Sequence, residues 1–85
     1  MKKIEWKRKQ YNYDGELVFE GEYLNGKKNG NGKEYYNNKL EFEGEYLNGE
    51  RKKGKEYYND KLEFEGEYLN GKRNGNGKEY YENGE

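Results

Sequence analysis

The sequence predicts an all-β fold, namely an elongated single-layer antiparallel meander of tandem β-hairpin repeats. The main observation is a repeated segment, Phe-Glu-Gly-Glu-Tyr-Leu-Asn-Gly, which begins at Phe19, Phe42 and Phe64, so that the period is 23 and then 22 residues. A period in this range is typical of architectures in which each repeat packs on its neighbours. Two further observations indicate strands in hairpins: apolar and charged residues alternate within each copy, and Asn, Asp and Gly separate the alternating segments.

Residues 1–16 are interpreted as a degenerate N-terminal half-repeat or cap. The stretch from Trp6 to Tyr13 is similar to the second half of a repeat, and Trp6 is expected to cover the open edge of the sheet. Residues 1–10 are basic, with five Lys or Arg and one Glu, in a chain of net charge −1. Such a segment could touch an anionic surface, although more often it only keeps a chain soluble.

Residues 17–39, 40–61 and 62–85 are predicted to be repeats 1, 2 and 3 of a single repeat domain, each with two strands and two turns. Side chains at alternate positions of a strand share a face, so each repeat is expected to have an aromatic face and a charged face. An Asn-Gly turn follows the first strand, and a Lys-Glu-Tyr-Tyr strand and a turn of Asn, Asp and Lys complete the repeat. In repeat 2 the alternate positions on the aromatic face are Leu40, Phe42, Gly44 and Tyr46.

The register of the strands is predicted by counting residues, since a slip of one residue moves every side chain to the other face. A three-residue loop at 37–39 would pair Tyr36 with Leu40 and Glu34 with Phe42. This pairing keeps Phe19 and Phe42 on one face, and it places Glu34 and Tyr36 on the same aromatic face. Repeat 2 is one residue shorter after its Asn-Gly, so we expect a loop of three residues there and of four residues in repeats 1 and 3. The alternative is a two-residue Asn-Gly turn throughout, which requires a bulge in repeat 2. The expected loops pair the glycines as Gly21–Gly32, Gly44–Gly54 and Gly66–Gly77.

The composition indicates a folded but marginal domain. Only 28% of the residues are hydrophobic and 41% are charged, values that alone would predict disorder. The eleven tyrosines, three phenylalanines and one tryptophan favour a folded chain, because aromatic rings supply most of the apolar area. Three isolated repeats are therefore expected to need neighbouring repeats, a dimer partner or a longer array.

The residue types that are missing exclude most enzyme chemistry. The chain has no Cys, His, Ser or Thr, which excludes disulfides, Cys/His zinc sites, hydroxyl or thiol nucleophiles and imidazole acid–base catalysis. We therefore expect a protein that is not an enzyme and has no cofactor and no metal. The sequence has no apolar run of membrane-spanning length and no apolar core of a signal peptide, so we expect a cytoplasmic protein.

Three motifs could carry chemistry, but for each of them a structural interpretation is better supported than a functional one. Gly49 to Lys55 has the spacing of a phosphate-binding loop, but Glu56 stands where that motif needs Ser or Thr. The glutamates of the charged face could hold calcium, yet interleaved lysines such as Lys33 favour cross-strand ion pairs on a solvated face. The same carboxylates could serve glycoside hydrolysis, but we expect a flat sheet without a cleft that would raise one pKa.

The aromatic face is the best candidate for an interaction site. Tyr and Phe rings stack on sugars, on bases or on the apolar side chains of a partner. We expect the rings first to stack between repeats, while those at the ends also meet a partner. Nucleic acid is not expected, because the chain beyond residue 10 is acidic and phosphate contacts dominate such binding. The candidate residues are Phe19, Tyr23, Tyr36, Phe42, Tyr46, Tyr58, Phe64, Tyr68 and Tyr81.

The repeated motif resembles a known family. The pattern Tyr/Phe-Glu-Gly-Glu-Tyr-x-Asn-Gly-Lys-x-x-Gly-x-Gly, between Tyr13 and Glu85, is similar to the MORN repeat (membrane occupation and recognition nexus). The Tyr-Tyr-Asn-x-Lys-Leu spacing also resembles a bacterial variant of this repeat. Repeat 2 departs from the pattern, because it has lost one glycine of Gly-x-Gly. The resemblance implies an elongated, twisted sheet of β-hairpins that serves mainly as a scaffold for protein contacts or self-association, with lipid binding suggested for some members.

The expected function is therefore a non-enzymatic repeat scaffold for protein–protein contact and self-association. The partner would be another protein or a second copy, in a homodimer or a longer array. Unpaired edge strands and near-identical repeats both favour association between copies. The alternative is peripheral binding to an anionic membrane surface through the basic residues 1–10.

Overall fold

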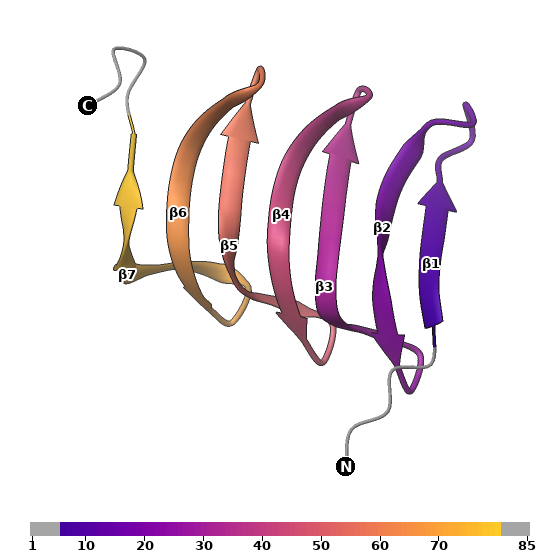
Figure 1. The fold of residues 1–85 in the computed structure, drawn as a ribbon, viewed down its shortest axis with the longest axis horizontal. Helices are drawn as coiled ribbons and strands as arrows, with labels where there is room; N and C mark the ends of the chain where they lie inside the picture. The colour runs from indigo at the N-terminus through magenta and orange to yellow at the C-terminus, as the bar shows by residue number, and fades with distance from the viewer. Residues whose placement is uncertain (1–5, 81–85) are drawn as a thin grey trace.

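The computed structural model describes residues 6–80, with Trp6 described by its backbone alone. These residues form one open sheet of seven antiparallel strands in the order of the sequence (Figure 1). The predicted all-β meander is thus confirmed, whereas the expected cap by the Trp6 side chain lies outside the described residues. The strands are β1 (Trp6–Tyr11), β2 (Leu17–Leu24), β3 (Lys27–Tyr36), β4 (Lys39–Leu47), β5 (Glu50–Tyr58), β6 (Lys61–Leu69) and β7 (Lys72–Glu79).

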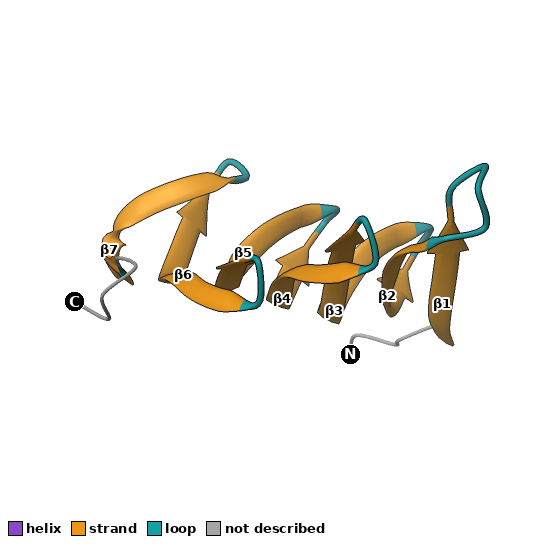
Figure 2. Ribbon diagram, turned by 90° about the horizontal axis from the view of Figure 1, so that it is seen from above, coloured by secondary structure: helices purple, strands orange, loops and turns teal. Residues whose placement is uncertain are grey.

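The sheet is a single layer. Figure 2 shows strands joined by short loops, with no second layer of described residues over either face. The extents of the molecule are 40 × 34 × 15 Å, so its thickness is about that of one sheet with its side chains. No helix that could cross a membrane occurs within residues 6–80.

The hairpin turns are shorter than expected. Tyr36 pairs with Lys39, so the turn at Asn37 and Asn38 has two residues, and both have positive φ (51° and 64°). The predicted three-residue loop and the pairing of Tyr36 with Leu40 are therefore wrong, whereas the predicted pairing of Glu34 with Phe42 is confirmed. Two left-handed residues form the type I′ turn, whose twist matches that of a hairpin. The same two-residue form occurs at Asn25-Gly26, Asn48-Gly49, Asn59-Asp60 and Asn70-Gly71.

Bulges, rather than loop lengths, bring the strands back into phase. Between the turn and the paired glycines the register shifts in all three Asn-Gly hairpins, and the larger shift is in repeats 1 and 3. In repeat 1 the bulge contains Gly30 at φ 96°, and the Glu22 carboxylate accepts a hydrogen bond from the backbone N–H of Asn31 at 2.7 Å. The expected loops of three and four residues are thus wrong, but all three predicted glycine pairs are confirmed.

Equivalent residues form three rows across all seven strands, because each glycine pair keeps its neighbours in register. We name these rows the glycine row, the charged row and the ring row. The glycine row contains Arg8, Gly21, Gly32, Gly44, Gly54, Gly66 and Gly77. The charged row contains Lys9, Glu20, Lys33, Glu43, Lys55, Glu65 and Lys78. The ring row contains Gln10, Phe19, Glu34, Phe42, Glu56, Phe64 and Glu79.

The core is one continuous line of rings on the aromatic face. Each phenylalanine meets a tyrosine ring edge-to-face, with centroids 5.4–5.9 Å apart, a geometry that aromatic pairs favour. The expected stacking of rings between repeats is confirmed, because Phe19 packs on Tyr46 of repeat 2 and Phe42 packs on Tyr68 of repeat 3. The buried rings are Phe19, Tyr23, Phe42, Tyr46, Phe64 and Tyr68.

Candidate functional site

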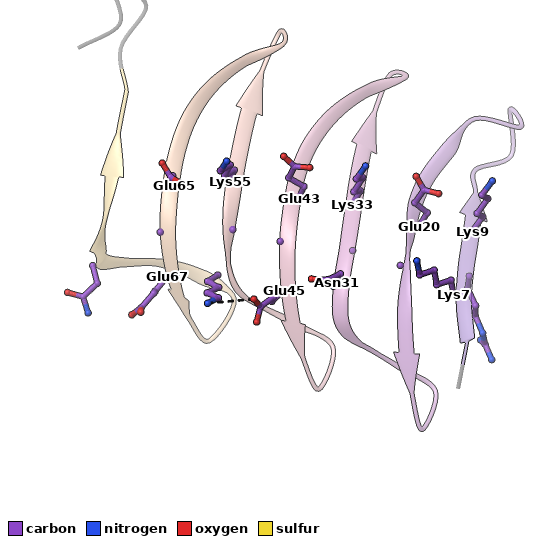
Figure 3. Close-up of a pocket in the computed structure, with 18 residues that line it drawn as sticks. Lys7, Lys9, Glu20, Asn31, Lys33, Glu43, Glu45, Lys55, Glu65 and Glu67 are labelled. Atoms are coloured by element: carbon purple, nitrogen blue, oxygen red, sulfur yellow. Dashed lines mark ion pairs between the residues drawn. The ribbon is translucent and has the colours of Figure 1, made fainter. Parts of the chain in front are cut away.

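The charged face is hollowed into a trough, whereas the sequence predicts a flat sheet without a cleft. Its volume is about 990 Å³, and the backbone of the glycine row lies along its floor. Figure 3 shows charged side chains from neighbouring strands on both sides of this floor. One side is the charged row from Lys9 to Glu65, and the other contains Lys7, Asn31, Glu45, Lys53 and Glu67.

Charge alternates along the trough from strand to strand. In the charged row the odd-numbered strands carry lysines and the even-numbered strands carry glutamates, so every neighbour has the opposite sign. On the other side of the floor, Lys53 on β5 forms an ion pair with Glu45 on the neighbouring β4 at 3.6 Å. Within residues 6–80 no group of acidic side chains has the geometry of a metal site.

Tyrosines hold the glutamates of the charged row in place. The Tyr57 hydroxyl donates to Glu43 at 2.8 Å, and equivalent bonds of 3.0 Å join Tyr35 to Glu20 and Tyr80 to Glu65. Burial and the hydrogen bond to Glu43 raise the pKa of Tyr57 to about 12, so this hydroxyl keeps its proton at neutral pH. The carboxylates beside the floor are thereby fixed in position.

A second set of carboxylates covers the rings on the opposite face. Arg51 donates two hydrogen bonds to Glu34, at 2.9 and 3.0 Å, and the Tyr46 hydroxyl donates a hydrogen bond to the same carboxylate. The Arg51 guanidinium lies 4.3 Å from the centre of the Phe42 ring. Bidentate pairing and contact with a ring are both favourable for arginine. Repeat 3 repeats this arrangement with Arg73, Glu56, Tyr68 and Phe64.

These contacts shift the pKa values of the carboxyls that cover the rings. Burial acts to raise the pKa of Glu34, but hydrogen bonds from Arg51 and Tyr46 outweigh it and lower the pKa below 4.5. The pKa of Glu56 is lowered in the same way, against burial, by Arg73 and Tyr68. A carboxyl with a lower pKa in the folded state stabilises the fold above its unfolded-state pKa, and this stabilisation is lost as the pH falls.

We therefore expect acid to weaken the fold as the pH falls below 4.5, the ordinary value for both groups. Replacing Glu34→Gln should lower the free energy of unfolding at neutral pH by about 1–3 kcal/mol, because it removes a charged acceptor. It should also make the urea midpoint less dependent on pH in acid. Glu41→Gln, at an exposed position on the neighbouring β4, is the matched control and should follow the unmodified chain. An identical acid dependence in the Glu34→Gln chain would contradict this origin of the acid sensitivity.

Repeat 1 lacks one of the carboxylates that cover the rings in the rest of the sheet. Gln10 occupies the place in the ring row that Glu34 and Glu56 occupy farther along. The Tyr23 hydroxyl is buried without a hydrogen-bond partner, and Tyr23 as a whole is 4% exposed. A buried hydroxyl without a partner costs about 1–3 kcal/mol.

The structure separates the predicted interaction residues into three groups. Six of them are the buried rings of the core, so in the described state they are covered. Tyr36 and Tyr58 stand next to the turns and are 67% and 68% exposed, apart from the buried line of rings. Tyr81 lies outside the described residues. The role of this set in binding stays a prediction.

Several residues that shape both faces were not singled out from the sequence. The sequence pattern assigns no role to Arg51 or Arg73, and it places Glu34 on the aromatic face without a binding partner. A signal was present, because each repeat places a basic residue at one position, namely Lys28, Arg51 or Arg73. Since an unpaired basic residue is costly among aromatic rings, its recurrence on this face indicates a carboxylate partner.

Comparison with known proteins identifies a repeat family. The family model of the MORN repeat matches residues 19–40 and 64–85, which together are about half of the chain. No curated protein and no solved structure matches. The matched segments begin at Phe19 and Phe64, two rings of the core that the fold repeats at equivalent positions. The sequence match and the meander of hairpins agree, and the chain belongs to the MORN repeat family.

Proposed function

We propose that this chain is a non-enzymatic repeat scaffold that works through protein–protein contact, including contact between copies. MORN repeats are a non-catalytic repeat type and are commonly associated with protein or membrane contact. The observation that supports the proposal is the open sheet, whose edge strands β1 and β7 each have one neighbour within residues 6–80. An unpaired edge offers backbone N–H and C=O groups to another chain.

The two edges differ in charge. β1 carries the consecutive cations Lys7, Arg8 and Lys9, which repel a second cationic strand. β7 carries both signs, and its Glu79 side chain is 60% exposed. The β7 edge should therefore accept a strand of another chain more readily than the β1 edge. The uncovered trough offers a second surface for a partner.

Sedimentation velocity at low and high micromolar concentration is expected to show a sedimentation coefficient that rises with concentration. Replacing Glu79→Lys removes the only acidic residue of β7 and leaves four cations on it, so association should weaken. Glu41→Lys makes the same charge change at an exposed position of the central strand β4, and it should leave association unchanged. A strict monomer at every concentration would contradict self-association and leave an outside protein as the only binding role.

The membrane alternative has less support from the described residues. Lys7 lies opposite Glu22 and Lys9 lies opposite Glu20, so two cations of the basic segment face carboxylates of β2. Neighbouring opposite charges reduce the field that an anionic surface would feel. Binding of an anionic membrane stays a prediction, and co-sedimentation with anionic vesicles at low and high salt measures it.

A further inference from the structure

The buried Tyr23 hydroxyl indicates that β1 is not the best neighbour for β2. In repeats 2 and 3 the equivalent tyrosine donates to a glutamate of the ring row, Tyr46 to Glu34 and Tyr68 to Glu56. Each of these glutamates lies opposite a phenylalanine, at the place that Gln10 has opposite Phe19. Tyr23 alone of the three buried tyrosines lacks a hydrogen-bond partner.

The strand that carries the missing carboxylate is β7. Its sequence Lys-Arg-Asn-Gly-Asn-Gly-Lys-Glu differs from the start of β3, Lys-Lys-Asn-Gly-Asn-Gly-Lys-Glu, at one position. On its far side β3 pairs with a Phe-Glu-Gly strand, β4, through a glycine pair, a Lys–Glu pair and a Glu–Phe pair. β7 has the same residues on an edge that is unpaired within the described part of the chain.

We propose that copies of this chain associate by strand exchange, in which β7 of one copy displaces β1 of the next and pairs with its β2. This mechanism rests on the self-association proposed above and specifies its contact. In the register of β3 and β4, Gly77 would lie opposite Gly21, Lys78 opposite Glu20, and Glu79 opposite Phe19. Each replaces one residue of β1, namely Arg8, Lys9 and Gln10. Glu79 then lies where the Tyr23 hydroxyl can donate a hydrogen bond to its carboxylate.

The direction of the strands permits this exchange. β1 and β7 run the same way across the sheet (Figure 1), so β7 of a second copy would be antiparallel to β2, as β1 is. The exchange also gives up a contact, because the Arg8 guanidinium of β1 lies 4.9 Å from the centre of the Tyr23 ring. In return it continues the glycine, charged and ring rows from one copy into the next.

Simple addition of β7 beside an intact β1 fits less well. Two copies in the same orientation would then pair β7 with β1 in parallel, with Lys78 beside Lys9 in the charged row. Like charges on adjacent strands are destabilising. In the exchanged arrangement Lys78 instead lies beside Glu20, so the alternation of charge continues.

Restoring the carboxylate on β1 tests the role of Tyr23. The Gln10→Glu variant gives Tyr23 an acceptor within its own copy, so β1 should hold its place and association should weaken about tenfold, as expected for one charged hydrogen bond. Glu79→Gln removes the acceptor from β7 and should also weaken association. Glu79 forms an ion pair with Arg73 at 3.2 Å. Glu63→Gln is therefore the matched control, because Glu63 forms the same kind of pair with Arg73 at 3.0 Å but lies outside the ring row. Unchanged or stronger association of the Gln10→Glu chain would overturn the proposal.

Cross-linking shows which strands meet. The chain has no cysteine, so the double variant Glu20→Cys, Lys78→Cys carries only the two introduced thiols. Within one copy β2 and β7 are five strands apart, about 24 Å, too far for a disulfide. Oxidation at high concentration should therefore give a ladder of cross-linked multimers, while the control double variant Lys9→Cys, Lys78→Cys should give none. A ladder from the control alone, or no ladder from either in a chain that sediments as multimers, would reject strand exchange and leave self-association standing.

Discussion

Replacing Gly44→Ala is expected to lower the free energy of unfolding by about 3 kcal/mol, at the upper end for overpacking a close contact. A Cβ atom at this position would lie 2.2 Å from the carbonyl oxygen of Lys53 and 2.6 Å from the Cα atom of Gly54. Both are backbone atoms of the neighbouring strand, which cannot rotate away as a flexible side chain would. The tip of the Phe42 ring, at 2.9 Å, closes the third side.

Gly75→Ala is the matched control for this prediction. Gly75 also lies within a strand, β7, but a Cβ atom there would meet nothing within 4 Å. Its replacement is expected to be neutral or to stabilise by a few tenths of a kcal/mol, because alanine restricts the unfolded chain. Urea denaturation of both variants measures the difference. Equal effects would show that the glycine row reflects flexibility rather than close packing.

Replacing Phe42→Ala is expected to cost about 3–5 kcal/mol, the range for a buried phenylalanine. Phe42 is 0% exposed and packs on two tyrosine rings, Tyr46 and Tyr68. Its ring also lies under the Arg51 guanidinium. A domain of 85 residues has a total stability of about 4–13 kcal/mol, so this variant should lose a large share of its stability. Circular dichroism and urea denaturation measure the loss.

Phe64→Ala is the matched control at the end of the ring row. Among the described residues Phe64 meets one tyrosine ring, that of Tyr68, where Phe42 meets two. We expect it to destabilise less than Phe42→Ala, because fewer neighbours lose contacts. Equal losses at the two positions would contradict a continuous line of rings in which interior repeats are held more firmly than the last one.

The fold could be predicted from the sequence because its signals are local. Alternation along Leu40, Phe42, Gly44 and Tyr46 assigns faces within one strand, and Asn-Gly marks the turns. The predicted glycine pairs are confirmed, although the loop lengths used to reach them are wrong. A longer loop and a two-residue turn with a bulge give the same pairing. Parity alone therefore could not distinguish them.

The candidate site could be predicted only in part. The sequence placed the glutamates and Lys33 on one face, and the structure shows them alternating beside the trough. The same reasoning expected a flat face, and it offered as an interaction site six rings that are buried. Burial was hard to predict because the layer that covers the rings comes from other strands. Arg51 on β5 reaches Glu34 on β3, 17 residues earlier in the chain.

The sequence by itself determined the strands, the two faces and the pairing of the glycines. All three follow from the two-residue period of a strand and from the positive φ that Asn and Gly tolerate. Only the tertiary structure decided the positions of the bulges, the carboxylates that Arg51 and Arg73 bind, and the hollow of the charged face. These depend on the twist of the sheet and on contacts between side chains of different strands, which are distances in space rather than intervals along the chain.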